Sequence, residues 1–379
     1  MTNTTTQMTI GIPRETKTAE NRVALTPEAV RELVAQGAQV SVETSAGSGA
    51  SIEDREYEQV GARIVQTAAE AWSQQMVVKV KEPQASEFQY LREDLTLFTY
   101  LHLAAYPKVA EALIAAKTTA VAYETVQTAN GALPLLAPMS EIAGRLAPQM
   151  AAQHLERHNG GRGVLLSGAP GVKPAHIVVL GAGVVGFNAA WIASGMGADV
   201  TILDKNIDRL RWVDDMKNGR IKTLTSNRGA LEQIVQEADA VIGAVLLPGG
   251  RAPVLVTEDM VKTMKPGSVL LDVAVDQGGC IETTKETTHN APTFMLHSVV
   301  HYAVGNMPGA VPRTSAYALS NATLPYVAMI ATKGLKESLQ SNTSLVPGLT
   351  TIDGKFVNID VARSLGMEPL SLDEALRAL

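Results

Sequence analysis

The first third of the chain alternates short β-branched runs with stretches of helical periodicity. We expect strands at Thr9–Ile12, Gln39–Glu43, Val77–Val80, Leu95–Tyr100 and Thr118–Tyr123. Between the first two runs, Thr26 should cap a helix that has Pro27 at its first position and ends at Gly37. Strands that alternate with helices in this way predict a parallel sheet covered by helices.

A second series of strands and helices follows the glycine-rich segment 160–171. Six strands with helices between them match the size of a complete Rossmann-type domain. The first helix of this series is expected over Asn188–Met196. We expect the strands at His176–Leu180, Asp199–Leu203, Ile221–Thr225, Ala240–Val245, Ser268–Ala274 and Thr293–Leu296.

The two series of elements define the expected domain organisation. Helical patterns at about 140–156 and 315–338 flank the second series, and the tail is too short to form a domain of its own. The predicted fold is therefore α/β, with two Rossmann-like doubly wound parallel-sheet domains and a cleft between them. The first domain is expected at 1–135, completed by 313–379, and the second at 136–312.

Composition narrows the class of protein without naming a reaction. Of 379 residues, 46% are hydrophobic and 18% are charged, which is typical of a globular protein with ample core. The net charge of −6 argues against a nucleic-acid partner, and no apolar segment is long enough for a membrane span. The single cysteine, Cys280, excludes an internal disulfide framework. The polar start, Met1–Gln7, does not resemble a signal peptide, so we expect a disordered tail and a cytoplasmic protein.

The strongest motif is the glycine pattern GxGxxG formed by Gly181, Gly183 and Gly186. A β-branched strand precedes it, an alanine-rich helix follows, and Asp204 ends the next strand. In this context the glycines allow a tight turn, a close approach of a pyrophosphate and close helix packing. Asp204 can accept hydrogen bonds from both ribose hydroxyls and would repel a 2′-phosphate. The motif predicts that domain 136–312 binds NAD; the alternative is a glycine turn that holds no nucleotide.

Four charged or titratable residues stand near predicted strand ends, where open α/β sheets build their sites. Arg22 and Lys81 could hold a carboxylate, and His102 and Asp276 could transfer protons. Each of these residues also has a purely structural interpretation. Arg22 could be a surface charge, and Lys81, with Lys79 beside it, could be a solvated lysine. His102 could pack in the core, and Asp276 could cap a turn. The other histidines show no metal spacing, and nucleophile-elbow and P-loop patterns are absent, which leaves metal, hydrolase and kinase functions without support.

Further motifs run along nearly the whole chain from Met8 onward: GIPRETKTAENRVALTP, VKVKEP, TYLHLAA, AYETVQTANGALPLLAPMSEIAGR, GAGVVG, LLDVAVDQGGC and NMPGAVPRTSAYALSNATLPY. Together they resemble the motifs of the alanine dehydrogenase family. The same superfamily contains the NAD-binding part of proton-translocating transhydrogenase and the saccharopine-type lysine dehydrogenases. The alanine dehydrogenases are the nearer resemblance, because APMSEIAGR, DQGG and NMPGAVP occur together.

The resemblance implies roles for particular residues. It implies that Arg22 and Lys81 bind the substrate and that His102 and Asp276 are the acid/base pair. Arg209 stands near the adenosine, where lysine is frequent in the family. Further residues implied at the cofactor are Met139, Ser140, Asn306 and Met307.

The implied activity is the reversible NAD-dependent oxidative deamination of L-alanine to pyruvate and ammonium, by a homohexamer whose two domains close over the cofactor. Two alternatives remain. One is the NAD-binding subunit of a proton-translocating transhydrogenase, which would need a membrane partner. The other is a non-catalytic NAD-sensing protein, although such a protein is expected to have lost the acid/base residues that this chain keeps at His102 and Asp276.

Overall fold

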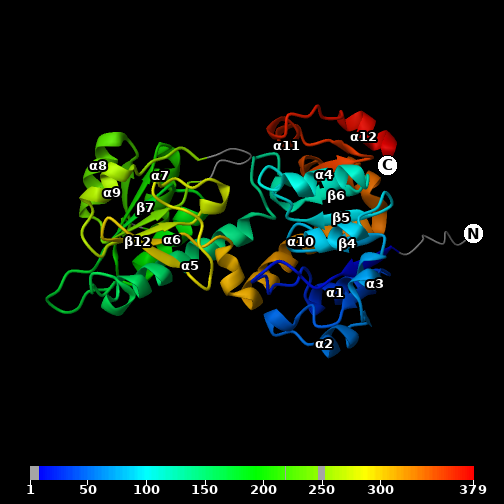
Figure 1. Cartoon of the computed structure of the whole chain (residues 1–379), viewed down its shortest axis with the longest axis horizontal. Coiled ribbons are helices and arrows are strands. Elements are labelled where there is room, and N and C mark those ends of the chain that lie inside the picture. The colour runs from blue at the N-terminus through cyan, green and yellow to red at the C-terminus, as the bar shows by residue number, and fades with distance from the viewer. Residues whose placement is uncertain (1–7, 218, 246–251) are drawn as a thin grey trace, which may run out of the picture. The chain divides into compact units, whose positions relative to one another are not determined.

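The computed structural model describes residues 8–217, 219–245 and 252–379, so the expected tail at Met1–Gln7 lies outside the described residues. The chain divides into two compact units (Figure 1). Unit 1 comprises Met1–Met139 and Val311–Leu379, and unit 2 comprises Ser140–Ala310. Each unit is built on its own sheet with mostly parallel strands, which confirms the predicted α/β class with two Rossmann-like sheets.

The sheet of unit 1 contains eight strands among the described residues, in the order β15-β14-β6-β5-β4-β1-β2-β3. Strands β1 to β6 run parallel, whereas β14 and β15 are antiparallel additions from the C-terminal tail. The strands are β1 (Thr9–Ile12), β2 (Gln39–Glu43), β3 (Arg63–Val65), β4 (Met76–Val78), β5 (Thr96–Thr99), β6 (Thr119–Ala122), β14 (Leu349–Ile352) and β15 (Lys355–Phe356).

Apolar faces of the helices close the core of unit 1. Helix α1 buries Ala29, Val30 and Leu33, which recur at helical spacing, and it packs against α10. Helix α10 contains a break at Gly334, whose φ of 77° and ψ of 162° are not helical. The α-helices of unit 1 are α1 (Pro27–Ala35), α2 (Asp54–Glu58), α3 (Ala68–Trp72), α4 (Pro107–Ala115), α10 (Pro312–Ser341), α11 (Ile359–Ser364) and α12 (Leu372–Ala378).

The start of α1 corrects one expectation. Thr26 occupies the N-cap position before Pro27, but its side chain does not cap the helix. Its hydroxyl lies 3.3 Å from the Ser320 hydroxyl on α10, and its backbone amide donates to the same oxygen at 3.0 Å. Because Thr26 is buried, its polar groups are paired with a neighbouring helix instead of the first turn of their own helix. The predicted end of the helix at Gly37 agrees with its positive φ of 93°.

The sheet of unit 2 contains seven strands in the described part of the chain, in the order β12-β13-β11-β10-β7-β8-β9. All neighbours are parallel except the pair β12 and β13. The strands are β7 (His176–Leu180), β8 (Asp199–Asp204), β9 (Lys222–Thr225), β10 (Ala240–Gly243), β11 (Val269–Asp272), β12 (Thr293–Leu296) and β13 (Val299–Tyr302). The helices that accompany them are α5 (Ala137–Leu155, which begins in unit 1), α6 (Val184–Gly195), α7 (Ile207–Lys217), α8 (Arg228–Glu237) and α9 (Glu258–Thr263).

Two expectations for unit 2 were wrong. The pattern predicted six strands and missed β13, because β12 and β13 are joined by only His297 and Ser298. Both residues have positive φ, 50° and 61°, although neither is the glycine or asparagine that marks such a turn. Helix α6 begins at Val184, directly after the glycine turn, and not at Asn188.

Candidate active site

The loop between β1 and α1 carries Arg22, whose side chain is only 2% exposed. Its Nε and Nη2 atoms donate to the Glu20 carboxylate at 2.6 and 2.5 Å, and Nη1 lies 3.0 Å from the Met139 sulfur. Burial alone would raise the pKa of Glu20, but the Arg22 guanidinium outweighs it and lowers the pKa to about 2. One edge of the guanidinium is thus held by an ionised carboxylate, and the adjacent nitrogen faces a weak acceptor.

Lys81 follows β4 and is also buried, at 6% exposed. Its charge acts on the carboxyls of Glu20 and Glu124 and on the His102 imidazole, so Lys81 lies close to all three groups. The structure therefore brings Arg22, Lys81 and His102 together within unit 1.

The neighbouring Lys79 has a different environment. Its ammonium is fully buried and pairs with Glu15 at 3.2 Å and with Glu87 at 2.9 Å. Burial raises the pKa of Glu15 to about 7, although Lys79 opposes this shift. Glu15 also accepts a hydrogen bond from the Val80 amide at 2.7 Å. Lys79 is thus part of a buried ion cluster beside the strand, and Lys81 stays the candidate for substrate binding.

His102 follows β5 and has a left-handed backbone conformation, with φ of 46°. This conformation is uncommon for a residue with a Cβ, and here Glu124 stabilises it. The Glu124 carboxylate accepts hydrogen bonds from the amides of Leu101 and His102, at 3.2 and 2.6 Å, and lies 3.8 Å from Nδ1 of the imidazole. The imidazole also stacks on Tyr100, with ring centroids 5.7 Å apart. The ring orientation is therefore fixed from two sides.

The electrostatic environment keeps His102 neutral. Burial lowers the pKa of His102 well below its usual range, and the positive charges of Lys81, Lys17 and Arg22 lower it further. Lys17 is held by the Glu82 carboxylate at 2.5 Å. A neutral imidazole is a proton acceptor, and the surrounding cations attract an anion. This cluster of unit 1, Arg22, Lys81 and His102 with Lys17 beside them, can bind a carboxylate next to a base.

The glycine turn of unit 2 joins β7 to α6. Gly181 has φ of 97°, and a Cβ on Gly186 would overlap the Gly181 carbonyl oxygen, so a side chain at either position would force the turn apart. Gly183 is the N-cap of the 12-residue helix α6, and the space where its Cβ would lie is open. The turn is thus a side-chain-free cradle at a helix N-terminus, which fits a dinucleotide pyrophosphate.

Asp204 ends β8 beside this cradle. Its Oδ2 accepts a hydrogen bond from the Ala182 amide at 2.7 Å, and its Oδ1 accepts one from the Asn206 amide at 2.8 Å. Arg209 reaches the same turn, where its Nη1 donates to the Ala182 carbonyl at 3.4 Å. The carboxylate is held at the glycine turn, where it can meet ribose hydroxyls and would repel a 2′-phosphate.

The other predicted cofactor and proton-transfer residues, apart from Met139, also belong to unit 2. Asp276 is exposed in a short turn, Val275–Gln277, just after β11. Asn306 has a left-handed φ of 60°, and Met307 beside it is buried. Ser140 is the fourth residue of α5.

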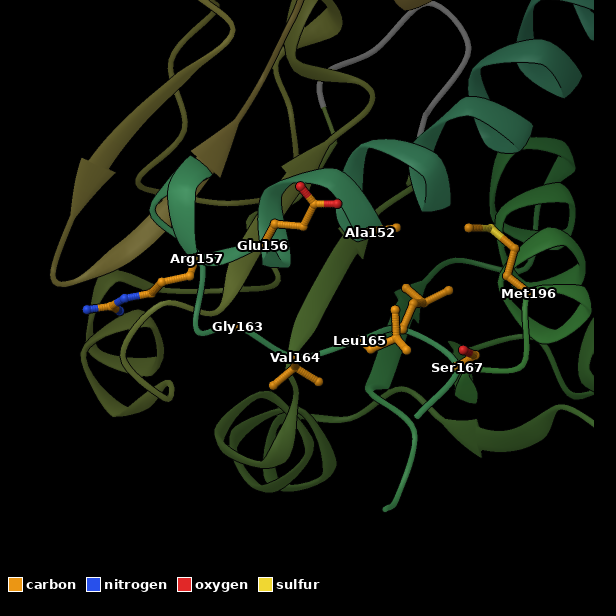
Figure 2. A pocket seen from close by; sticks show the side chains of 9 residues that line it. Ala152, Glu156, Arg157, Gly163, Val164, Leu165, Ser167 and Met196 are labelled. Atoms are coloured by element: carbon orange, nitrogen blue, oxygen red, sulfur yellow. The ribbon is translucent and has the colours of Figure 1, made fainter. Parts of the chain in front are cut away.

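Unit 2 also contains a hollow of about 410 Å³ away from these residues, lined by the end of α5, the following loop and Met196 (Figure 2). Its wall is mostly apolar and includes Glu156 and Arg157. None of the predicted site residues lines it, so it adds nothing to the candidate active site. In the described residues, His, Cys, Asp and Glu do not gather in a group of three or more that could hold a metal ion.

Comparison with known families decides which proteins this chain resembles. The family model described as "Alanine dehydrogenase/PNT, N-terminal domain" matches residues 11–143, and "Alanine dehydrogenase/PNT, C-terminal domain" matches residues 147–359. The chain belongs to the alanine dehydrogenase/PNT family. The resemblance inferred from the sequence motifs is therefore confirmed.

Within the alanine dehydrogenase/PNT family, the chain is similar to alanine dehydrogenases over its full length. It is 55% identical to alanine dehydrogenase 2 of Staphylococcus aureus (strain USA300) over 371 residues, which are 98% of this chain and 100% of the relative. It is 53% identical to alanine dehydrogenase of Staphylococcus epidermidis (strain ATCC 12228), again over 98% of this chain and 100% of the relative.

Two solved structures also resemble this chain over most of its length, the first more closely than the second. An L-alanine dehydrogenase matches with a TM-score of 0.92 and 51% identity, over 95% of this chain and 99% of that one. A transhydrogenase from Sinorhizobium meliloti matches with a TM-score of 0.78 and 27% identity, over 92% of this chain and 98% of that one. Across the described residues, none of the helices has both the length and the apolar character that crossing a membrane requires.

Sequence reasoning missed the carboxylates that organise the cluster of unit 1. Glu20 holds Arg22, and Glu124 holds the backbone and faces the ring of His102. The spacing of Glu20, two residues before Arg22, is a weak signal because charged loops are usually solvated. Glu124 lies 22 residues after His102, and only the pairing of β5 with β6 brings the two together.

Proposed function

We propose that this chain is an L-alanine dehydrogenase, an oxidoreductase that acts on a CH–NH₂ donor. It catalyses the reversible NAD-dependent oxidative deamination of L-alanine to pyruvate and ammonium. The observation that carries this proposal is the cluster of unit 1, where Arg22 and Lys81 lie beside a neutral, oriented His102. Its similarity to alanine dehydrogenases over 98% of its length supports the choice of substrate.

NAD is the proposed cofactor, and its hydride acceptor is the nicotinamide ring. The glycine turn and the N-terminus of α6 would hold its pyrophosphate, and Asp204 would hold its adenosine ribose, with Arg209 nearby. Unit 2 would thus serve as the NAD-binding domain, for which we proposed residues 136–312. Unit 1 would serve as the substrate domain, for which we proposed residues 1–135 and 313–379.

Substrate binding follows from how Arg22 is held. Glu20 binds Nε and Nη2 of Arg22 and so fixes the orientation of the guanidinium, which would bind the substrate carboxylate. Lys81 supplies the second positive charge.

The proton steps can be assigned to the chain's own residues. The alanine ammonium would first lose a proton to solvent, and bound NAD would supply the acceptor for the Cα hydride, which would leave an iminium on the substrate. Water adds to the iminium carbon while the neutral His102 accepts the proton of that water. The resulting carbinolamine would break down to pyruvate and ammonia, and the proton held by His102 would convert the ammonia to ammonium. Asp276 would orient the water and stabilise the positive charge of the iminium.

We also propose an assembly and a location for this chain. The family resemblance supports a homohexamer in the cytoplasm, with small molecules as its partners and with neither nucleic acid nor membrane. Asn306 and Met307 would close on the nicotinamide ring, and Met139 and Ser140 would border the cofactor.

Measuring NADH formation with a panel of amino acids tests this function. We expect turnover with L-alanine and NAD to exceed that with L-serine, glycine and L-lysine, and NADP to be a poor replacement for NAD. Preference for L-lysine would indicate a different amino-acid dehydrogenase. NADH binding without turnover of any amino acid would favour an NAD-binding or transhydrogenase-like protein.

A further inference from the structure

The carboxylate of Asp272, at the end of β11, closes the loop that carries Asp276. The Asp272 side chain is 1% exposed. Its Oδ2 accepts hydrogen bonds from the amides of Cys280 and Ile281, at 3.1 and 3.3 Å, and from the Thr284 hydroxyl at 2.7 Å. A single oxygen therefore joins the start of this loop to its end.

The loop has little freedom to follow another path. Gly278 and Gly279 both have positive φ, 98° and 56°, and a Cβ on Gly279 would overlap the Asp272 carboxylate. The Gly279 amide donates to the Ala274 carbonyl at 3.0 Å, which tightens the turn around Asp276. The contact between Asp272 and the segment 280–284 therefore restrains the loop on which Asp276 stands.

Thr284 connects the closing carboxylate to the backbone. Its hydroxyl donates to Asp272 at 2.7 Å and lies 2.8 Å from the Ile281 carbonyl. Burial raises the pKa of Asp272, and the Thr284 hydroxyl and the Ile281 amide are among the groups that offset this effect. These hydrogen bonds favour the charged form of the carboxylate and so act against the effect of burial. Hydrogen bonds to a charged carboxylate are stronger than those between neutral groups.

We propose that Asp272 and Thr284 are positioning residues that hold Asp276 in the position that catalysis requires. They touch neither substrate nor cofactor in this account, and they act by fixing both ends of the loop 273–279. The inference rests on the proposed catalytic role of Asp276. The experiments below distinguish failure of the positioning role from failure of that catalytic role.

Thr284→Val is the main test because valine keeps the shape of threonine and removes the hydroxyl. We expect kcat for L-alanine deamination to fall about tenfold, the scale of one lost hydrogen bond to a charged group. The NADH Kd should stay within about twofold of the wild-type value, and Thr284→Ser should restore kcat. Thr263→Val is the matched control, because the Thr263 hydroxyl donates to the Met260 carbonyl of its own helix and not to this loop.

The same substitution in an Asp276→Asn background shows whether Thr284 acts through Asp276. If it does, Thr284→Val should change the remaining turnover by less than about twofold in that background. A tenfold loss of kcat from Thr284→Val in both the wild-type and the Asp276→Asn background would overturn the inference. Wild-type kcat in the single variant Thr284→Val would also overturn it. Either result would leave the role of Asp276 intact. Wild-type turnover in Asp276→Asn would remove the catalytic role itself, and the positioning role with it.

Asp272→Asn gives an independent result if Thr284→Val does not fold. Asparagine keeps an acceptor oxygen for the three donors but loses the charge that strengthens their bonds. We expect a loss of kcat of about three- to tenfold with an unchanged NADH Kd. Unchanged kcat in a folded Asp272→Asn protein would contradict the positioning role.

Discussion

Glu20 determines how Arg22 can meet an anion. Because the carboxylate takes Nε and Nη2, the guanidinium is kept in one orientation, and its charge is partly offset before any substrate arrives. The nearby charge of Lys81 then matters more for the attraction of a second carboxylate. Both cations also lower the pKa of His102, so substrate binding and base strength are coupled in this cluster.

Arg22→Lys should weaken substrate binding without loss of the fold. Lysine keeps the positive charge but lacks the planar guanidinium, so it cannot hold the Glu20 carboxylate and a substrate carboxylate in the same geometry. We expect the KM for pyruvate to rise about ten- to hundredfold, with the melting temperature and the NADH Kd little changed. Arg313→Lys is the matched control, since Arg313 donates to the backbone carbonyl of Ser51. An unchanged KM would exclude Arg22 from the substrate site.

Pyruvate binding should become tighter as the pH falls below about 6.5, the usual pKa of a histidine, because the pKa of His102 in the free protein lies well below that value. Burial lowers the pKa of His102 in the free protein, and the nearby cations lower it further. A bound anion offsets the charge of the cations, so the pKa of His102 rises on binding. The complex then binds more protons than the free protein, and lower pH favours it. Titrations of the NADH-bound protein with pyruvate measure this dependence. His102→Gln should abolish it, whereas His158→Gln, an exposed control, should keep it.

At the level of elements, strand positions were predictable where a β-branched run is bounded by turn residues. Strands β1, β2, β7 and β12 have the predicted bounds. Four strands were missed, β3, β13, β14 and β15. Of these, β3 and β15 have only three and two residues, too few to show an alternating pattern. The glycine turn was predictable because each glycine has a local steric reason. The pairing of Glu124 with His102 was not, because it depends on which strands become neighbours.

Gly186→Ala tests the close packing of the glycine turn. The added Cβ would overlap the Gly181 carbonyl, so α6 must shift away from the position that suits a pyrophosphate. We expect the NADH Kd to rise at least about tenfold. Gly195→Ala is the control in the same helix, because the space beside Gly195 is open. There alanine should leave the NADH Kd unchanged. Equal NADH affinity in the two variants would argue against this turn as the nucleotide site.

At the scale of the whole molecule, the division at Met139 and Ala310 separates two kinds of chemistry. Unit 1 carries the cations and the base, and unit 2 carries the nucleotide cradle and the loop of Asp276. The proposed reaction needs groups from both units, so catalysis requires the units to act together. The sequence alone indicated both sets of groups but could not show which carboxylates hold them.

The proposed closure of the two domains should be visible in solution. We expect the radius of gyration from X-ray scattering to decrease when NADH is added to the wild-type protein. Gly186→Ala, at an NADH concentration that saturates the wild type but not the variant, should show less change. A wild-type radius that does not respond to saturating NADH would contradict closure on cofactor binding.

The most direct test of the account is product formation from pyruvate, ammonium and NADH by the wild type and by His102→Ala. We predict that the wild type forms L-alanine in an amount equal to the NADH consumed. His102→Ala should bind NADH with similar affinity and melt at a similar temperature, but its kcat should be lower by about 10²–10⁴-fold. Absence of L-alanine from the wild-type reaction, or near-normal turnover by His102→Ala, would contradict the account.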